Sequence, residues 1–129
     1  MTGTGARHLQ LGRLGEKSAV KFLKRCGYKI LARNFSCFLG EIDIVARKNE
    51  VISFVEVKTR RSTRFGIPME AVTRAKKKKL AELAWFYLTK YNLLSVPCRF
   101  DVVSVLVKRE RWPRKIKVNL VKDAFWVED

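Results

Sequence analysis

Two alternating segments joined by a short turn constrain the fold of this chain more than any other feature. Residues 41–48 read EIDIVARK and residues 51–58 read VISFVEVK, and both are rich in β-branched residues. They flank Asn49-Glu50, where asparagine suits the first position of a tight turn and glutamate is a poor residue for the second. We therefore predict a β-hairpin over residues 40–60, with a turn type that the sequence leaves open.

The register of this hairpin is predicted to bring acidic residues together. With a turn of two or four residues centred on that dipeptide, Asp43 lies directly opposite Glu56. By the same register Glu41 lies opposite Lys58, and opposed residues share a face, with Cβ atoms about 5 Å apart. The other face then carries an apolar set suited to a core, namely Ile42, Ile44, Val55 and Val57. A slip of one residue would place the acids on opposite faces.

Two carboxylates at that spacing repel each other, so a stable protein needs a cation between them or a proton on one of them. Hard oxygen ligands beside a basic surface suit Mg²⁺ or Mn²⁺, which also bind substrate phosphates. Lys58 can reach an attacking water or the charge that develops on phosphorus. Together these elements predict metal-assisted phosphodiester hydrolysis, with Asp43 and Glu56 as metal ligands. The alternative is an ordinary Glu41–Lys58 salt bridge beside two solvated acids.

The rest of the chain predicts helices packed on a sheet. A helical period runs from Leu11, and Gly27 is placed to end that helix. Pro68 opens a second helix that is expected to run to about Asn92. The three aromatic residues at positions 85–87 of this helix are interpreted as core and interface residues, not as a platform for base stacking. Three further strands are predicted, over residues 28–35, 99–107 and 115–121.

Length and composition fit one α/β domain. The chain has 129 residues, of which 47% are hydrophobic, enough for a real core. Residues 1–10 are polar and rich in glycine and threonine, which predicts a flexible arm, and residues 11–129 are expected to form the single nuclease-like domain. The predicted order α-β-β-β-α-β-β favours a central mixed five-stranded sheet flanked by helices.

An excess of basic residues points to a polyanionic partner. The chain has 28 Lys and Arg against 12 Asp and Glu, a net charge of +16, which favours nucleic acid first and an anionic membrane second. No apolar run is long enough to cross a membrane, and three scattered cysteines indicate no disulfide framework, so we expect a cytoplasmic protein. The expected phosphate-binding residues are Arg60, Arg61, Arg64, Arg74, Lys76, Lys77, Lys78 and Lys79.

Two charged residues leave alternatives open. Lys76 falls between Val72 and Leu83 on the apolar stripe of the second helix, so its ammonium either reaches solvent or is aimed at the carboxylate face. Asp101 begins a strand that is otherwise full of valines. It either joins the site or is a structural partner for Arg99 or for a backbone amide.

Five ordered motifs resemble a known family. They are GEKSAVKFL, GEIDIVA, FVEVKTR, FGIPMEAV and RFDVV, within about residues 11–125. In that order they resemble the YraN-like family of small bacterial proteins, part of the restriction-endonuclease-like PD-(D/E)xK superfamily and similar to archaeal Holliday-junction resolvases. The resemblance implies a metal-dependent endonuclease acting on DNA, with branched or junction DNA as a candidate substrate and RNA left open.

The resemblance also implies roles for individual residues. Asp43 matches the metal-binding aspartate of the superfamily, while Glu56 and Lys58 match its E-x-K motif. Glu16 matches the glutamate of the first helix that completes the site, and the carbonyl of Val57 is the implied third metal ligand. A homodimer is implied as well, since a four-way junction presents two equivalent strands.

Three interpretations remain beside this one. Read from the residues alone, Glu16 lies at the edge of the apolar stripe and suits an ordinary surface residue. The whole chain can also be a non-catalytic nucleic-acid-binding module that keeps a nuclease fold. Finally, it can be a subunit that needs a partner in a DNA-processing complex.

Overall fold

The computed structural model describes the backbone of residues 3–61, 74–108 and 115–122, and the side chains of these ranges from residue 10 onward. The elements, in chain order, are α1 (Gly3–Arg25), β1 (Lys29–Cys37), β2 (Gly40–Lys48), β3 (Val51–Arg60), α2 (Arg74–Lys90), β4 (Cys98–Lys108) and β5 (Lys115–Val121). The predicted α/β class and the order α-β-β-β-α-β-β are confirmed.

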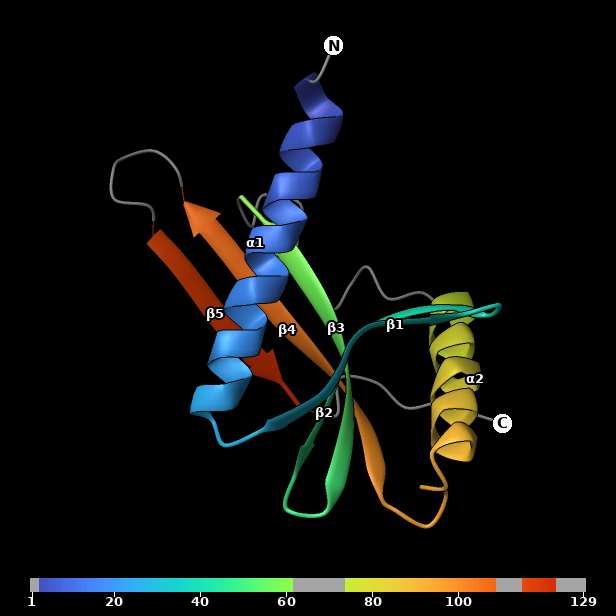
Figure 1. Cartoon of the computed structure of the whole chain (residues 1–129). Coiled ribbons are helices and arrows are strands. Elements are labelled where there is room, and N and C mark those ends of the chain that lie inside the picture. The colour runs from blue at the N-terminus through green and yellow to red at the C-terminus, as the bar shows by residue number, and fades with distance from the viewer. Residues whose placement is uncertain (1–2, 62–73, 109–114, 123–129) are drawn as a thin grey trace.

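The strands form one five-stranded mixed sheet in the order β1-β2-β3-β4-β5. Neighbouring strands are antiparallel except β3 and β4, which are parallel because the connection between them contains α2. Figure 1 shows α1 lying across the sheet and α2 standing beside the bent β1–β2 hairpin. The two helices cover opposite faces of the sheet, so both faces bury apolar side chains.

Each face has its own hydrophobic cluster. The cluster under α1 includes Ala19, Leu23, Ile44, Val55, Val103, Val105 and Val107. The cluster under α2 includes Val45, Ile52, Phe54, Leu80, Leu83, Ala84 and Tyr87. Tyr87 therefore belongs to the core as predicted, whereas Trp85 is 64% exposed and corrects the core interpretation of that residue. Within the described part of the chain, neither helix is long and apolar enough to span a bilayer.

The first helix begins earlier than predicted and ends where predicted. It starts at Gly3, not at Leu11, because the N-terminal residues hold no proline that would stop it, so the predicted arm over residues 1–10 is helical from Gly3 onward. Gly27 has φ 90°, the left-handed conformation that ends helices, and the Tyr28 N–H donates to the Leu23 carbonyl at 2.9 Å.

The β2–β3 hairpin has the predicted register at its turn. The ladder runs from the turn to the pair Ile44 and Val55. Asn49 and Glu50 both have positive φ, 50° and 68°, as a tight two-residue hairpin turn requires. Glutamate is a strained choice there, and its carboxylate accepts a hydrogen bond from Arg47 at 3.3 Å.

The predicted continuation of this ladder is wrong. Beyond its last pair, β2 and β3 no longer pair, whereas β2 remains paired with β1 as far as the turn between those two strands. The β1–β2 hairpin bends away from the sheet and extends over α2 (Figure 1). The two pairs expected on the acidic face, Asp43–Glu56 and Glu41–Lys58, are therefore not ladder partners.

The bend also divides the apolar set that was expected on one face. Ile44 and Val55 pack in the cluster under α1, with the partly buried Val57 against it. Ile42 packs in the cluster under α2 instead. The predicted single apolar face is wrong at Ile42 because β2 leaves the plane of the sheet between the two isoleucines.

Candidate functional site

Three carboxylates converge where the β1–β2 hairpin leaves the sheet. Glu16 comes from α1, and Glu41 and Asp43 come from β2. One carboxylate oxygen of each lies within 4.8 Å of the others. Asn34 on β1 donates a hydrogen bond from Nδ2 to Glu16 Oε2 at 3.3 Å. The structure thus brings Glu16 and Glu41 to Asp43, and we call these three residues the acidic cluster.

A close contact between α1 and β3 positions Glu16. Gly15 is buried, and a Cβ atom added there would lie 1.7 Å from Thr59 Oγ1 and 2.8 Å from Thr59 Cβ. Only glycine therefore allows this helix–strand distance, and the next residue is Glu16. Sequence reasoning could not find the contact with Thr59, because it depends on how the helix crosses the strand.

Asp43 is held in an environment that disfavours its charge. Its Oδ2 accepts a hydrogen bond from the Val57 N–H at 2.8 Å. Burial raises the pKa of Asp43 to about 6, and the negative charges of Glu56, Glu16 and Glu41 act in the same direction against that hydrogen bond. Among the described residues, no lysine or arginine forms an ion pair with the acidic cluster. Lys76 attracts Asp43 electrostatically but is paired with Glu56, so no cation in the described part of the chain is paired with the cluster itself.

Glu56 has the opposite environment, because two lysines share one of its oxygens. Glu56 Oε1 lies 3.2 Å from Lys58 Nζ and 2.6 Å from Lys76 Nζ. Of the two positions considered for Lys76, the structure has the one aimed at the sheet. Burial lowers the pKa of Lys58, and Lys76 lowers it further. Burial also acts downward on Lys76, but the contacts with Glu56 and Lys58 and the negative charges of Glu56 and Asp43 together outweigh it, so the pKa of Lys76 is raised.

Acids and a lysine face one cavity. The cavity has a volume of about 280 Å³. Its lining comes from α1, β2 and β3, and comprises Leu11, Gly12, Glu16, Asp43, Val57, Lys58 and Thr59. Four of the residues predicted for the site, Glu16, Asp43, Val57 and Lys58, therefore surround one space that a small ion and a phosphate oxygen can share.

Asp101 lies outside this site. It is fully buried, and both of its oxygens accept from Arg99 Nε at 3.0 Å. The Ser53 hydroxyl also donates to Asp101 Oδ2. Arg99 donates further to the Tyr28 hydroxyl at 2.6 Å. The interpretation of Asp101 as a structural partner for Arg99 is therefore the one that the structure has.

The predicted phosphate-binding residues lie on β3 and α2. Arg60 is half-buried at the end of β3, and Arg61 is exposed directly after it. On the first turns of α2, Lys76 and Lys77 are half-buried, while the exposed residues are Arg74, Lys78 and Lys79. Arg64 and the predicted start of the second helix at Pro68 lie outside the described residues.

Comparison with known proteins identifies relatives of the whole chain. The model of the uncharacterised protein family UPF0102 matches residues 15–105. A UPF0102 protein of Caldicellulosiruptor saccharolyticus is 48% identical over 118 residues, which cover 90% of this chain and 97% of the relative. The corresponding protein of Syntrophus aciditrophicus is 44% identical over 119 residues, covering 92% and 91% of the two chains. That of Symbiobacterium thermophilum is 46% identical over 117 residues, covering 90% and 96%.

Proposed function

This chain belongs to the uncharacterised protein family UPF0102, the YraN-like family that its motifs resemble, and we propose that it is a divalent-metal-dependent endonuclease. Its proposed reaction is the hydrolysis of DNA phosphodiesters. Because membership of the family states no reaction, the proposal is argued from the site. The observation that carries the proposal is the acidic cluster. It has no cation partner among the described residues, yet it stands beside the two ammonium groups on Glu56. Placement in the restriction-endonuclease-like PD-(D/E)xK superfamily is part of the same proposal.

The chemistry of the donors fits Mg²⁺ or Mn²⁺. Every donor of the acidic cluster is a carboxylate oxygen. Burial raises the pKa of Asp43, and the charges of Glu56, Glu16 and Glu41 add to this effect, as expected for a group that an added cation would stabilise. Glu16, Glu41 and Asp43 would hold the ion, with Glu56 and the Val57 carbonyl as further ligands. When bound, such an ion polarises the phosphate and activates the attacking water.

The remaining residues of the site bind and orient the substrate. Lys58 lines the cavity, and Lys76 from α2 shares Glu56 Oε1 with it, so we assign both ammonium groups to stabilising the charge that develops on phosphorus. Glu16 is placed to orient the attacking water. The exposed basic residues of α2 extend this surface and would bind the phosphates on either side of the scissile bond.

The substrate class follows from charge and from the family resemblance. A net charge of +16 on 129 residues favours a polyanion, and DNA with a branch or junction is the substrate that a resolvase-like enzyme would cut. Two copies acting as a homodimer would cut the two equivalent strands of a four-way junction. Sedimentation with and without such a junction would test this assembly.

Cleavage of a labelled DNA panel tests the proposed function. Duplex, single strand, flap and four-way junction would each be incubated with Mg²⁺, Mn²⁺ or EDTA. The proteins compared would be the wild type, Asp43→Asn, and Glu50→Gln, which changes an acid whose side chain is 88% exposed at the hairpin turn. We expect metal-dependent cutting by the wild type and by Glu50→Gln, and none by Asp43→Asn. Comparable cutting by Asp43→Asn, or binding without cutting in either metal, would contradict the proposal, and the latter would favour a binding module or a partner-dependent subunit.

A further inference from the structure

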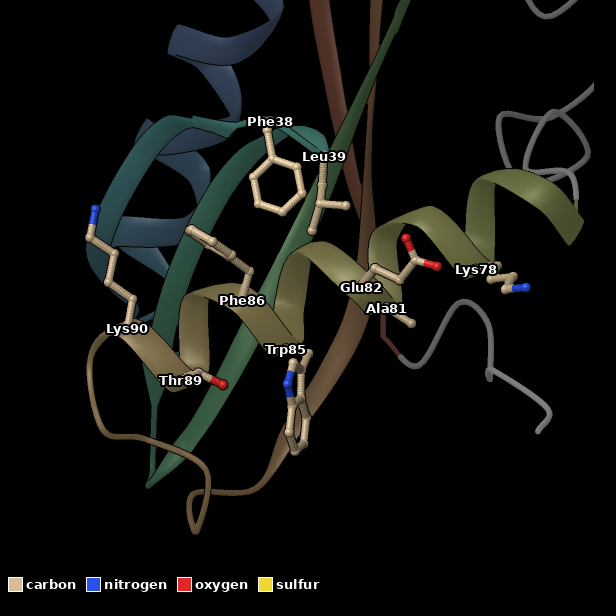
Figure 2. A pocket seen from close by; sticks show the side chains of 9 residues that line it. All are labelled: Phe38, Leu39, Lys78, Ala81, Glu82, Trp85, Phe86, Thr89 and Lys90. Atoms are coloured by element: carbon tan, nitrogen blue, oxygen red, sulfur yellow. The ribbon is translucent and has the colours of Figure 1, made fainter.

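An exposed apolar groove lies outside the candidate active site, between the β1–β2 turn and α2. Phe38 and Leu39 come from the turn, while Ala81, Trp85 and Phe86 come from α2 (Figure 2). Its volume is about 740 Å³. Phe38 is 84% exposed and Trp85 is 64% exposed, whereas large apolar side chains usually pack in the core. The edge-to-face contact of Phe38 with Phe86, with ring centroids 5.7 Å apart, fixes the aromatic wall of the groove.

The charges around this groove are mainly positive. Lys78 and Lys90 stand at its two ends, and Glu82 is the acidic residue among the described lining residues (Figure 2). The two lysines are twelve positions apart on the helix, which corresponds to about 18 Å along its axis. This arrangement is complementary to a ligand that is apolar in the middle and negatively charged on both sides. A second copy of this chain, with its own net charge of +16, is not such a ligand.

The groove continues the surface proposed to bind phosphates. Lys78, one of the residues proposed to bind phosphates, lines the groove and lies on the same helix as Trp85. Seven positions of helix, or about 10 Å, separate Lys78 from Trp85, and because seven positions make almost two full turns both side chains lie on one face of α2. A DNA strand that follows the exposed basic residues of α2 therefore reaches the aromatic residues.

We propose, resting on the proposed function for the identity of the ligand, that this groove binds the unpaired bases of a DNA strand. Bases stack on Trp85 and Phe38, while Lys78 and Lys90 bind the flanking phosphates. The apolar lining offers few polar groups to read base edges, so binding is tolerant of sequence. The preferred substrate is then DNA with a single-stranded region next to the scissile bond, such as a flap or an opened junction.

Binding of labelled oligonucleotides in EDTA tests this proposal without cleavage. The ligands are a single strand of about 20 nucleotides, long enough for the usual site of a stacking surface, the same strand with abasic sites at its centre, and a blunt duplex. The variants are Trp85→Ala and Phe38→Ala, whose exposed side chains allow truncation without opening the core. Ile116→Ala, which removes an exposed apolar side chain of β5, is the matched control.

We expect Trp85→Ala to weaken single-strand binding by about 5- to 150-fold, with a similar or smaller loss for Phe38→Ala. Duplex binding should stay within about twofold of the wild type, and the abasic strand should bind the wild type as weakly as the intact strand binds Trp85→Ala. Circular dichroism checks that each variant is folded.

Unchanged single-strand binding by both variants, equal loss on single strand and duplex, or full affinity for the abasic strand would each overturn the proposal. We would then assign the groove to binding a protein partner with an acidic, apolar segment. The two proposals can fail separately. Base-dependent binding without any cleavage would contradict the nuclease alone, and cleavage with binding that ignores Trp85 would contradict the stacking groove alone.

Discussion

Asp43 and Asp101 are aspartates of one sheet with opposite surroundings. Asp101 is fully buried, and Arg99 and Ser53 both bind its carboxylate. Asp43 is half-buried, accepts a hydrogen bond from the backbone of Val57, and faces other acids. The charge of Asp101 is thus balanced by the chain, whereas the charge of Asp43 opposes its own neighbours.

We interpret this difference as one between a structural carboxylate, Asp101, and the carboxylate that the proposed function uses, Asp43. Burial of a charge without a partner is costly, so an ordinary core position would be paired, as Asp101 is. Under the proposed function, Asp43 keeps an unfavourable environment because a cation from outside the chain would complete the acidic cluster. Substitution should therefore have opposite effects at the two positions: loss of function with gain of stability at Asp43, and loss of stability at Asp101.

The largest expected effect is on cleavage by Asp43→Asn. Removing one ligand charge should lower the cleavage rate by about 1,000-fold, because tenfold in rate corresponds to about 1.4 kcal/mol and the bound ion supplies several kcal/mol. Rates would be measured under single-turnover conditions with Mg²⁺ or Mn²⁺. A loss of less than about tenfold would place the reaction elsewhere on the molecule.

The second effect is on the stability of Asp101→Ala. Removing the buried carboxylate leaves the partly buried guanidinium of Arg99 without its counter-ion, which should cost about 3–5 kcal/mol in the free energy of unfolding. Urea denaturation measures it, with Glu50→Gln as an exposed control. A cost below about 1 kcal/mol would show that Asp101 is not the structural counterpart of Asp43.

The third effect is a pH dependence that Asp43 causes in metal-free buffer. Its pKa is raised from 3.8 to about 6 on folding, so the folded state binds the proton more tightly than the unfolded state. Protonated Asp43 therefore adds to the free energy of unfolding below pH 4, and this contribution is lost as the pH rises to about 6. The loss is at most roughly 3 kcal/mol. The difference in unfolding free energy between Asp43→Asn and the wild type should grow in favour of the variant over that interval. A difference that is constant with pH would contradict the assigned environment.

A smaller effect is expected at Gly15, which sets the distance between α1 and β3. Gly15→Ala should weaken Mn²⁺ binding by about tenfold, because the added methyl group displaces Glu16 from the acidic cluster. Calorimetric titration would measure the affinity. Gln10→Ala, which truncates an exposed neutral side chain of the same helix outside the cavity lining, is the control. Removing the opposing side chain in Gly15→Ala/Thr59→Gly should restore part of the affinity, and equal behaviour of the two single variants would contradict this role.

The sequence predicted the fold and part of the site because both depend on local patterns. Alternation around Asn49-Glu50 was sufficient for the hairpin register, and the two-residue spacing of Arg99 and Asp101 was sufficient to suggest their pairing. The bend of the β1–β2 hairpin was not predictable. It depends on tertiary packing of its aromatic residues on α2, where Phe35 stacks edge-to-face on Tyr87 at 5.1 Å.

That bend decides the composition of the site. It removes Asp43 from the ladder with Glu56 and places Glu41 beside Glu16 instead. Meanwhile Lys76, from a helix far along the chain, contacts Glu56. An expectation based on one hairpin therefore identified the acidic residues but not their grouping, because the grouping is set by two helices and a bent strand pair.

Mn²⁺ titration of the metal-free protein tests the central claim most directly. The wild type, Asp43→Asn and Glu50→Gln would be compared by isothermal titration calorimetry at pH 6, where about half of Asp43 is protonated. We predict that the wild type and Glu50→Gln bind Mn²⁺ and release protons, since the pKa of Asp43 is about 6 without metal, and that Asp43→Asn loses this binding. Equal Mn²⁺ affinity of the wild type and Asp43→Asn would contradict the assignment of the acidic cluster as a metal site.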